Sequence, residues 1–153
     1  VITRHEDKIK SSDILARLGL VKSDYFLVSL HREENVDEPE KLKKIINSLE
    51  ILSEEFEKRV IISTHPRTKN QLKTHNITCS SNIMLLEPFG FFEYCKLQKE
   101  CFCTLSDSGT ITEEASIIGF PAVMLREMHE RPEGTDVAAV PLGSLESDSL
   151  SLA

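Results

Sequence analysis

Residues 105–116 hold the side chains best suited to contact a ligand. Before them, residues 101–105 are short and apolar and predict a buried strand, and residues 111–118 predict a helix that ends at Gly119. Ser108, Gly109 and Thr110 lie between the two. A strand that enters a helix through small residues directs free N–H groups and the positive end of the helix dipole at one point, which suits a phosphate group.

The start of this helix fits a capping box, in which the Thr110 hydroxyl and the Glu113 carboxylate satisfy free N–H groups of the first turn. Glu114 follows, where a carboxylate could accept hydrogen bonds from sugar hydroxyls. An ordinary capped junction that binds nothing is the alternative, and it stays open. The pattern is neither a Walker loop, since no Lys follows the Gly, nor a dinucleotide fingerprint, since there is only one Gly.

Apolar strands alternate with helices along the chain. Such strands are covered on both faces, which predicts an α/β fold with a doubly wound, Rossmann-like parallel sheet of about five strands. The predicted strands are residues 25–30, 59–63, 83–86, 101–105 and 122–125. The main predicted helices are residues 39–56, about 69–75 and 111–118, and an aromatic segment at 89–94 leads into a further helix that reaches residue 98.

Ligands of open α/β sheets bind beyond the carboxyl ends of the strands. Three of the five histidines, His31, His65 and His129, follow predicted strands. A single His is usually structural and loops are polar in any case, so this convergence leaves a functional and a structural interpretation about equal.

The composition narrows the classes of partner. The 153 residues form one domain by length, and the net charge of −7 argues against a nucleic-acid surface. No apolar run is long enough to span a membrane, and no signal peptide is recognisable, so we expect a cytoplasmic protein without a membrane partner. The cysteines form no C-x-x-C pair, which predicts reduced thiols and no metal site; Cys101 and Cys103 should face the same side of a strand.

Four motifs in register then resemble the non-hydrolysing UDP-N-acetylglucosamine 2-epimerases over residues 26–134. They are the run S-L-H-R-E-E-N at 29–35, T-H-P at 64–66, D-S-G at 107–109 with E-E-A at 113–115, and E-R-P-E at 130–133. The family has two Rossmann-like domains in the glycosyltransferase-B arrangement. The resemblance implies that residues 1–153 are one UDP-binding domain, the carboxyl-terminal half, with a domain-entry segment at 1–10 and an irregular or truncated tail at 142–153.

The resemblance also implies residue roles. His31 would be catalytic and, with Ser108, would contact the diphosphate. Gly109 and Thr110 would present backbone N–H groups, and Glu114 would take the ribose hydroxyls. The main chain near Tyr94 would read the uracil, and the substrate cleft would be lined by Arg32, His65 and Arg131.

The implied reaction inverts C2 of the amino sugar by elimination and re-addition of UDP, without a cofactor. The carboxylates that handle the sugar protons would belong to a missing amino-terminal Rossmann-like domain, so this chain alone should be inactive. The full-length protein would be a possible homodimer. Thr110 stands where the family usually has a second Gly, and residues 126–136 look more like the branch that uses UDP-2-acetamido-2,6-dideoxy-L-hexoses for capsule and O-antigen synthesis.

Two other functions remain possible at this point. The chain could be the donor-binding half of a glycosyltransferase-B UDP-sugar glycosyltransferase, or a non-catalytic nucleotide-sugar binding module.

Overall fold

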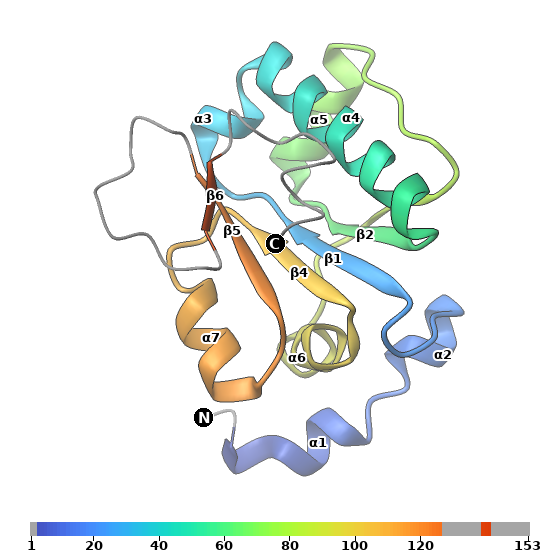
Figure 1. Cartoon of the computed structure of the whole chain (residues 1–153), viewed down its shortest axis with the longest axis vertical. Helices are drawn as coiled ribbons and strands as arrows, with labels where there is room; N and C mark the ends of the chain where they lie inside the picture. The colour runs from blue at the N-terminus through green and yellow to red at the C-terminus, as the bar shows by residue number, and fades with distance from the viewer. Residues whose placement is uncertain (1–2, 127–138, 142–153) are drawn as a thin grey trace.

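The computed structural model describes residues 3–126 and 139–141, and Figure 1 shows their arrangement. A 3-10 turn at Thr3–His5 precedes the first helix. The helices are α1 (Glu6–Lys10), α2 (Ile14–Leu18), α3 (Glu33–Val36), α4 (Pro39–Phe56), α5 (Pro66–Thr74), α6 (Phe91–Glu100) and α7 (Ile111–Ile118). The strands are β1 (Tyr25–Ser29), β2 (Arg59–Ser63), β3 (Ile83–Leu86), β4 (Cys103–Ser106), β5 (Ala122–Arg126) and β6 (Ala139–Pro141).

The strands form one sheet in the order β3-β2-β1-β4-β5-β6, and every neighbouring pair is parallel. The order reverses direction after β1, as in a doubly wound sheet, so the predicted fold is confirmed. The sixth strand, β6, was not predicted, because three residues are too few to show a period. β1 and β4 are neighbours at the centre, where Ser29 pairs with Ser106.

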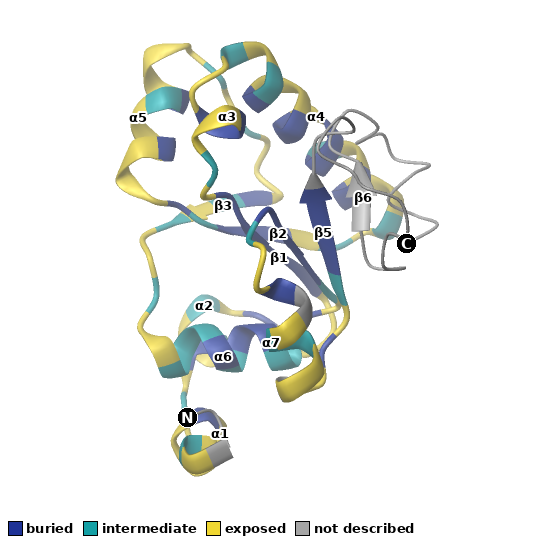
Figure 2. Cartoon of the chain, turned by 90° about the vertical axis from the view of Figure 1, so that its left-hand side faces the viewer, coloured by how far each residue is buried: buried dark blue, intermediate teal, exposed yellow. Residues whose placement is uncertain are grey.

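Helices cover both faces of the sheet. Figures 1 and 2 show α3, α4 and α5 on one side of the buried strands and α2, α6 and α7 on the other, with α1 against the outside of α6. One hydrophobic cluster fills the space under α4, a second lies under α6, and a smaller one lies under α7. The two faces are therefore closed and leave the ends of the strands as the place for a site.

The helix α4 follows directly from its sequence. Pro39 occupies the first turn, where its missing N–H costs nothing, and the helix ends at Glu57 in a left-handed conformation with φ of 52°. Its apolar stripe is buried against β1 and β2, and truncating one such Leu or Ile to Ala typically costs about 2–5 kcal/mol. The stripe consists of Leu42, Ile45, Ile46, Leu49 and Leu52.

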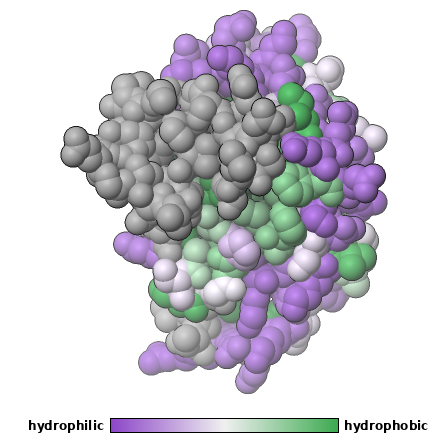
Figure 3. All heavy atoms as spheres, viewed as in Figure 1, coloured by the Kyte–Doolittle hydropathy of each residue, from purple (hydrophilic) through white to green (hydrophobic). Residues whose placement is uncertain are grey.

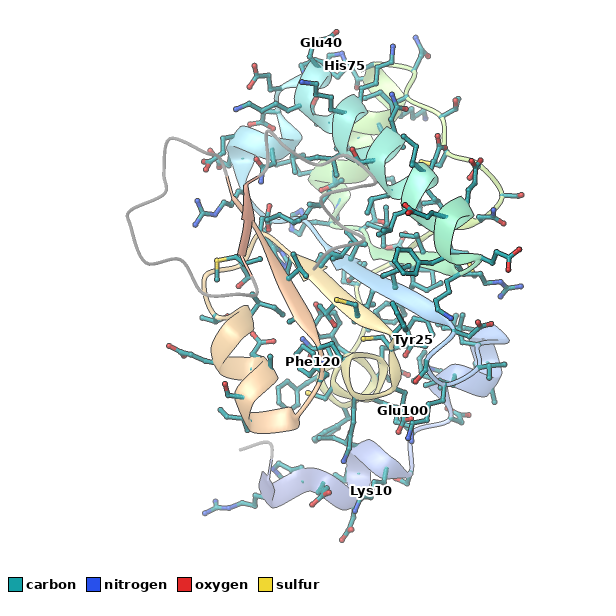
Figure 4. All side chains as sticks on the ribbon, viewed as in Figure 1. Lys10, Tyr25, Glu40, His75, Glu100 and Phe120 are labelled. Atoms are coloured by element: carbon teal, nitrogen blue, oxygen red, sulfur yellow. The ribbon has the colours of Figure 1, made fainter. Side chains whose placement is uncertain are left out.

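The central strand β1 is buried at all five positions. Its first residue, Tyr25, is anchored to the other layer, because the phenol hydroxyl donates a hydrogen bond of 2.6 Å to the carbonyl oxygen of Leu97 in α6. Figure 4 shows Tyr25 beside α6. The strand that carries His31 just beyond its end is thus fixed at its beginning.

Some boundaries differ from the sequence prediction. The helix α5 begins at Pro66 rather than at residue 69, because the His65 ring accepts a hydrogen bond from the Arg67 N–H and caps it. Cys101 lies in the turn before β4 and packs in the α6-side cluster, whereas Cys103 packs against the α4-side cluster. The prediction that these two thiols share a face was wrong, because the strand starts later than expected.

The visible surface in Figure 3 is hydrophilic over the outer helices and more apolar near its centre. None of the helices in the described part of the chain has the length and apolarity needed to cross a membrane.

Candidate functional site

Two turns meet at the carboxyl edge of the central strands. Since β1 and β4 are parallel neighbours that both end near this edge, the residues after Ser29 lie beside the residues after Ser106. The Asp107 N–H donates a hydrogen bond of 3.3 Å to the Ser29 carbonyl oxygen and extends the pairing by one residue. The turns that carry His31 and Ser108 therefore lie side by side at the carboxyl edge of the sheet.

The Asp107 side chain connects these turns. It is fully buried, and its carboxylate accepts hydrogen bonds from the backbone N–H groups of His31 at 2.8 Å and Arg32 at 2.9 Å. The side-chain amide of Asn35 donates a third, at 3.0 Å. In return, the Arg32 Nε donates to the Asp107 carbonyl oxygen at 3.0 Å. The Asn35 Oδ1 is buried and has no hydrogen-bond partner among the described residues.

The His31 ring is held by a side chain of β1. Its Nε2 lies 2.5 Å from the hydroxyl oxygen of Ser29, a residue that is buried at the end of β1. A hydrogen bond that uses Nε2 fixes the orientation of the imidazole and leaves Nδ1 for another partner.

A second chain of hydrogen bonds runs from the β4–α7 turn into α6. The hydroxyls of Ser108 and Thr110 lie 3.0 Å apart, and Thr110 Oγ1 donates to Glu114 Oε1 at 2.9 Å. The other carboxylate oxygen, Oε2, accepts from Nε2 of the buried Gln98 at 2.9 Å. The residues expected to contact diphosphate and ribose are thus already linked.

The predicted capping box does not form. Thr110 is the N-cap of α7, but its φ of −95° and ψ of −1° are helical and its side chain makes no capping hydrogen bond. The hydroxyl donates instead to the carboxylate of Glu114, four residues ahead. The side chain of Thr110 therefore belongs to the polar network of the site.

The supply of free N–H groups in the turn is limited. Ser108 N–H donates to the Ser106 hydroxyl at 3.1 Å, and Ile111 N–H donates to the Ser108 carbonyl at 3.4 Å. Thr110 N–H makes only a long contact of 3.4 Å to Ser108 Oγ. Gly109 N–H has no acceptor among residues 3–126 and 139–141, and a Cβ added to Gly109 would meet nothing within 4 Å. A ligand could therefore approach Gly109 closely.

Tyr94 lies near the beginning of α6 (Phe91–Glu100). Burial raises the pKa of the phenol to about 12, although hydrogen bonding to Ser29 lowers it in part. Its own N–H donates to the carbonyl oxygen of Gly90, the N-cap residue of α6. The N–H groups that precede Tyr94 in the first turn of α6 have no acceptor within the helix. That the main chain near Tyr94 reads the uracil stays a prediction, and these N–H groups are the ones that could do so.

The two other predicted cleft residues in the described part also lie at this edge. A cavity of about 190 Å³ is lined by His31 and His65 together with Val36 and Arg67. Arg67 is not free for a ligand in this state, because it forms ion pairs with Glu33 and Asp37. Arg32 follows His31 directly and bonds Glu34 at 3.2 Å.

Arg131 and His129 lie outside the described residues. Among the remaining histidines, His75 lies on the outer surface at the end of α5, where its ring bonds Gln71 at 3.0 Å (Figure 4). No group of three or more His, Cys, Asp and Glu in residues 3–126 and 139–141 is arranged to hold a metal ion.

Sequence reasoning missed the roles of Ser29, Gln98 and Asp107. Asp107 was visible as part of a motif, and its position after a strand was a usable signal. The partners of Gln98 depend on how α6 and α7 pack, and no pattern within one element reveals them.

Comparison with known proteins adds the decisive observation. Residues 1–151 match the family described as UDP-N-acetylglucosamine 2-epimerase. This chain belongs to that family. A curated relative of that name from Methanocaldococcus jannaschii is 41% identical over 124 residues, which are 78% of this chain and 34% of the relative. The chain thus spans about a third of the length of that relative.

Solved structures agree. The UDP-N-acetylglucosamine 2-epimerase from Rickettsia bellii superposes on this chain with a TM-score of 0.76 at 42% identity. The superposed region covers 99% of this chain and 40% of the Rickettsia bellii chain. The structure of the Methanocaldococcus jannaschii enzyme in complex with UDP-GlcNAc and UDP has a TM-score of 0.76 at 36% identity. That match covers 94% of this chain and 41% of the enzyme's chain. The family resemblance is confirmed, and the coverage is consistent with one Rossmann-like half of a glycosyltransferase-B arrangement.

Proposed function

We propose that this chain holds the nucleotide of a UDP-N-acetyl-amino sugar in a 2-epimerase. The observation that carries the proposal is the meeting of His31, Ser108 and Glu114 at one sheet edge. Asp107 bonds the His31 N–H, and the next residue, Ser108, begins the hydrogen-bond chain through Thr110 to Glu114. The solved relative that binds UDP-GlcNAc and UDP supports the choice of ligand.

In the proposed complex the diphosphate lies against the β4–α7 turn. Ser108 donates its hydroxyl, Gly109 its N–H group, and the N-terminus of α7 its positive dipole end. Glu114 accepts hydrogen bonds from the ribose hydroxyls, and uracil lies against the start of α6. Arg32, His65 and Arg131 line the sugar side of the cleft.

The reaction we propose is inversion at C2. A base removes the C2 proton while the C1–O bond to UDP breaks and its electron pair leaves with the diphosphate, which gives a 2-acetamidoglycal and UDP. UDP then adds back to C1 and a proton is delivered to the opposite face of C2. Negative charge grows on the leaving diphosphate, where His31, Ser108 and the α7 dipole stabilise it.

The carboxylates that exchange the C2 proton come, in this proposal, from an amino-terminal domain outside this chain. The chain alone therefore binds UDP and UDP-sugars without epimerising the sugar. The substrate pair is UDP-GlcNAc and UDP-ManNAc or a UDP-6-deoxy-L-hexosamine analogue. We place the reaction in the cytoplasm, in a homodimeric enzyme that serves capsule or O-antigen synthesis.

Two measurements test the proposal. UDP should raise the melting temperature of the 153-residue chain by mass action, with GDP as the control nucleotide, and no shift at millimolar UDP would contradict it. A full-length protein with UDP-GlcNAc in deuterated water should incorporate deuterium at C2 without an acceptor. Sugar transfer only with an acceptor would identify a glycosyltransferase, and binding without exchange would identify a non-catalytic module.

A further inference from the structure

The proposed diphosphate contacts come from two separate turns, one after β1 and one after β4. A single anion can use both only if their spacing is fixed. The adjacent strands set this spacing to the level of Ser29 and Ser106, but His31 and Ser108 lie beyond the last paired residues. An interaction between the two turns is therefore needed to fix the position of His31 relative to Ser108.

Asp107 makes that interaction from both its main chain and its side chain. The main chain bonds the Ser29 carbonyl through N–H and the Arg32 Nε through its carbonyl. The carboxylate uses Oδ1 for His31 N–H, and Oδ2 for Arg32 N–H and the Asn35 amide. A buried carboxylate is costly unless it is fully hydrogen-bonded, so removing it would leave its donors without acceptors.

These bonds also decide which groups of the first turn can meet an anion. The N–H groups of His31 and Arg32 both donate to the Asp107 carboxylate. In this turn an anion can therefore be bound by side chains and not by these backbone groups. The N–H of Gly109 in the other turn has no acceptor among the described residues. The two turns therefore contribute different chemistry at a spacing that Asp107 holds.

We propose that Asp107 is a positioning residue that aligns the His31 turn with the Ser108 turn for a diphosphate. This inference rests on the proposed function. Asp107 itself does not touch the ligand; it acts through the backbone of His31 and Arg32 and through its own neighbour Ser108.

The variant Asp107→Asn tests this because it keeps the shape and one acceptor oxygen. The amide oxygen can still accept from His31 N–H, and Asn35, whose Oδ1 has no partner among the described residues, can turn to accept from the new amide. Arg32 N–H then loses its hydrogen bond to the Asp107 carboxylate. We expect the Kd for UDP to rise roughly tenfold, the Kd for uridine to stay the same, and amide exchange at Arg32 to accelerate.

The control is Asp24→Asn, which removes the same charge at the opposite edge, where Asp24 bonds Lys58 at 3.5 Å; it should change neither Kd. Should Asp107→Asn fail to fold, Asn35→Ala is the second variant. It removes the amide that shares Oδ2 with the Arg32 N–H, so the carboxylate is held less firmly against that turn. UDP binding should then weaken roughly threefold with uridine binding unchanged, and unchanged binding of both would overturn the positioning role.

The outcomes separate the two proposals. Without UDP binding to the unmodified chain, the proposed function and this inference both fail. Tight UDP binding that survives Asp107→Asn unchanged overturns the positioning role alone. Equal weakening of UDP and uridine also overturns it, because a general loss of structure would not distinguish the diphosphate from the nucleoside.

Discussion

The Gln98 amide donates a hydrogen bond of 2.9 Å to Glu114 Oε2 and so joins α6 to α7 beneath the proposed ribose position. Glu114 Oε1 is held at the same time by Thr110. The carboxylate is therefore oriented before any nucleotide arrives, and a pre-organised group loses less entropy on binding.

Replacing Gln98 with Leu should weaken UDP binding about three- to tenfold, the value of one hydrogen bond. Isothermal titration with 2′,3′-dideoxy-UDP should show no such loss, because that ligand has no hydroxyls for Glu114. Gln71→Leu is the matched control, since Gln71 also makes one side-chain hydrogen bond, to His75 on the outer surface. An equal loss with both nucleotides would show that Gln98 does not act through the ribose.

Gly109→Ala should abolish tight UDP binding without destabilising the chain. A Cβ meets no atom within 4 Å, and Gly109 is not among the residues with positive φ. Such a substitution commonly stabilises a fold by about 0.4–1 kcal/mol through the unfolded state. Thermal melting should be unchanged or higher while the UDP affinity falls at least about tenfold. Undiminished affinity would place the diphosphate elsewhere.

Ser29→Ala removes the hydroxyl that lies 2.5 Å from His31 Nε2. We expect the ¹⁵N chemical shifts of the His31 ring to change and UDP affinity to fall several-fold, because the imidazole loses its fixed orientation. Ser53→Ala is the control: Ser53 is equally buried and bonds the Lys58 carbonyl at 2.5 Å, far from the site. If both variants bind UDP like the unmodified chain, Ser29 has only a structural role.

The buried thiol of Cys101 should make the free energy of unfolding depend on pH. Burial raises the pKa of this thiol from 9.0 to about 11. Between these values the unfolded thiol releases its proton while the folded thiol keeps it, so this contribution is complete below pH 9 and is lost as the pH rises to about 11. The loss is about 2–3 kcal/mol. Urea unfolding at several pH values should show a shallower decline for Cys101→Ala, and parallel curves would contradict the assignment.

Much of the fold could be predicted because single elements carry their own signals. The period of apolar residues in α4 and the continuous apolar runs of β1 and β2 depend only on local sequence, and their predicted positions match the structure closely. The position of His31 and Ser108 at one edge followed from the parallel topology alone.

The connections inside the site could not be predicted in the same way. Thr110 fitted a capping box by residue type, yet its backbone is helical, it makes no capping bond and its hydroxyl donates to Glu114. Gln98 reaches Glu114 only through the packing of α6 and α7 on the sheet. Asp107 faces donors that lie about 75 residues away in sequence. Such partners are set by tertiary distances, which no periodicity encodes.

The proposed site is built on β1 and β4, the two innermost strands, with β3 and β6 at the margins. A marginal strand can detach by breaking the hydrogen bonds on only one of its sides, and such partial opening would leave the His31 and Ser108 turns in place. Nucleotide affinity should therefore persist through mild denaturation and disappear only with the cooperative collapse of the whole sheet.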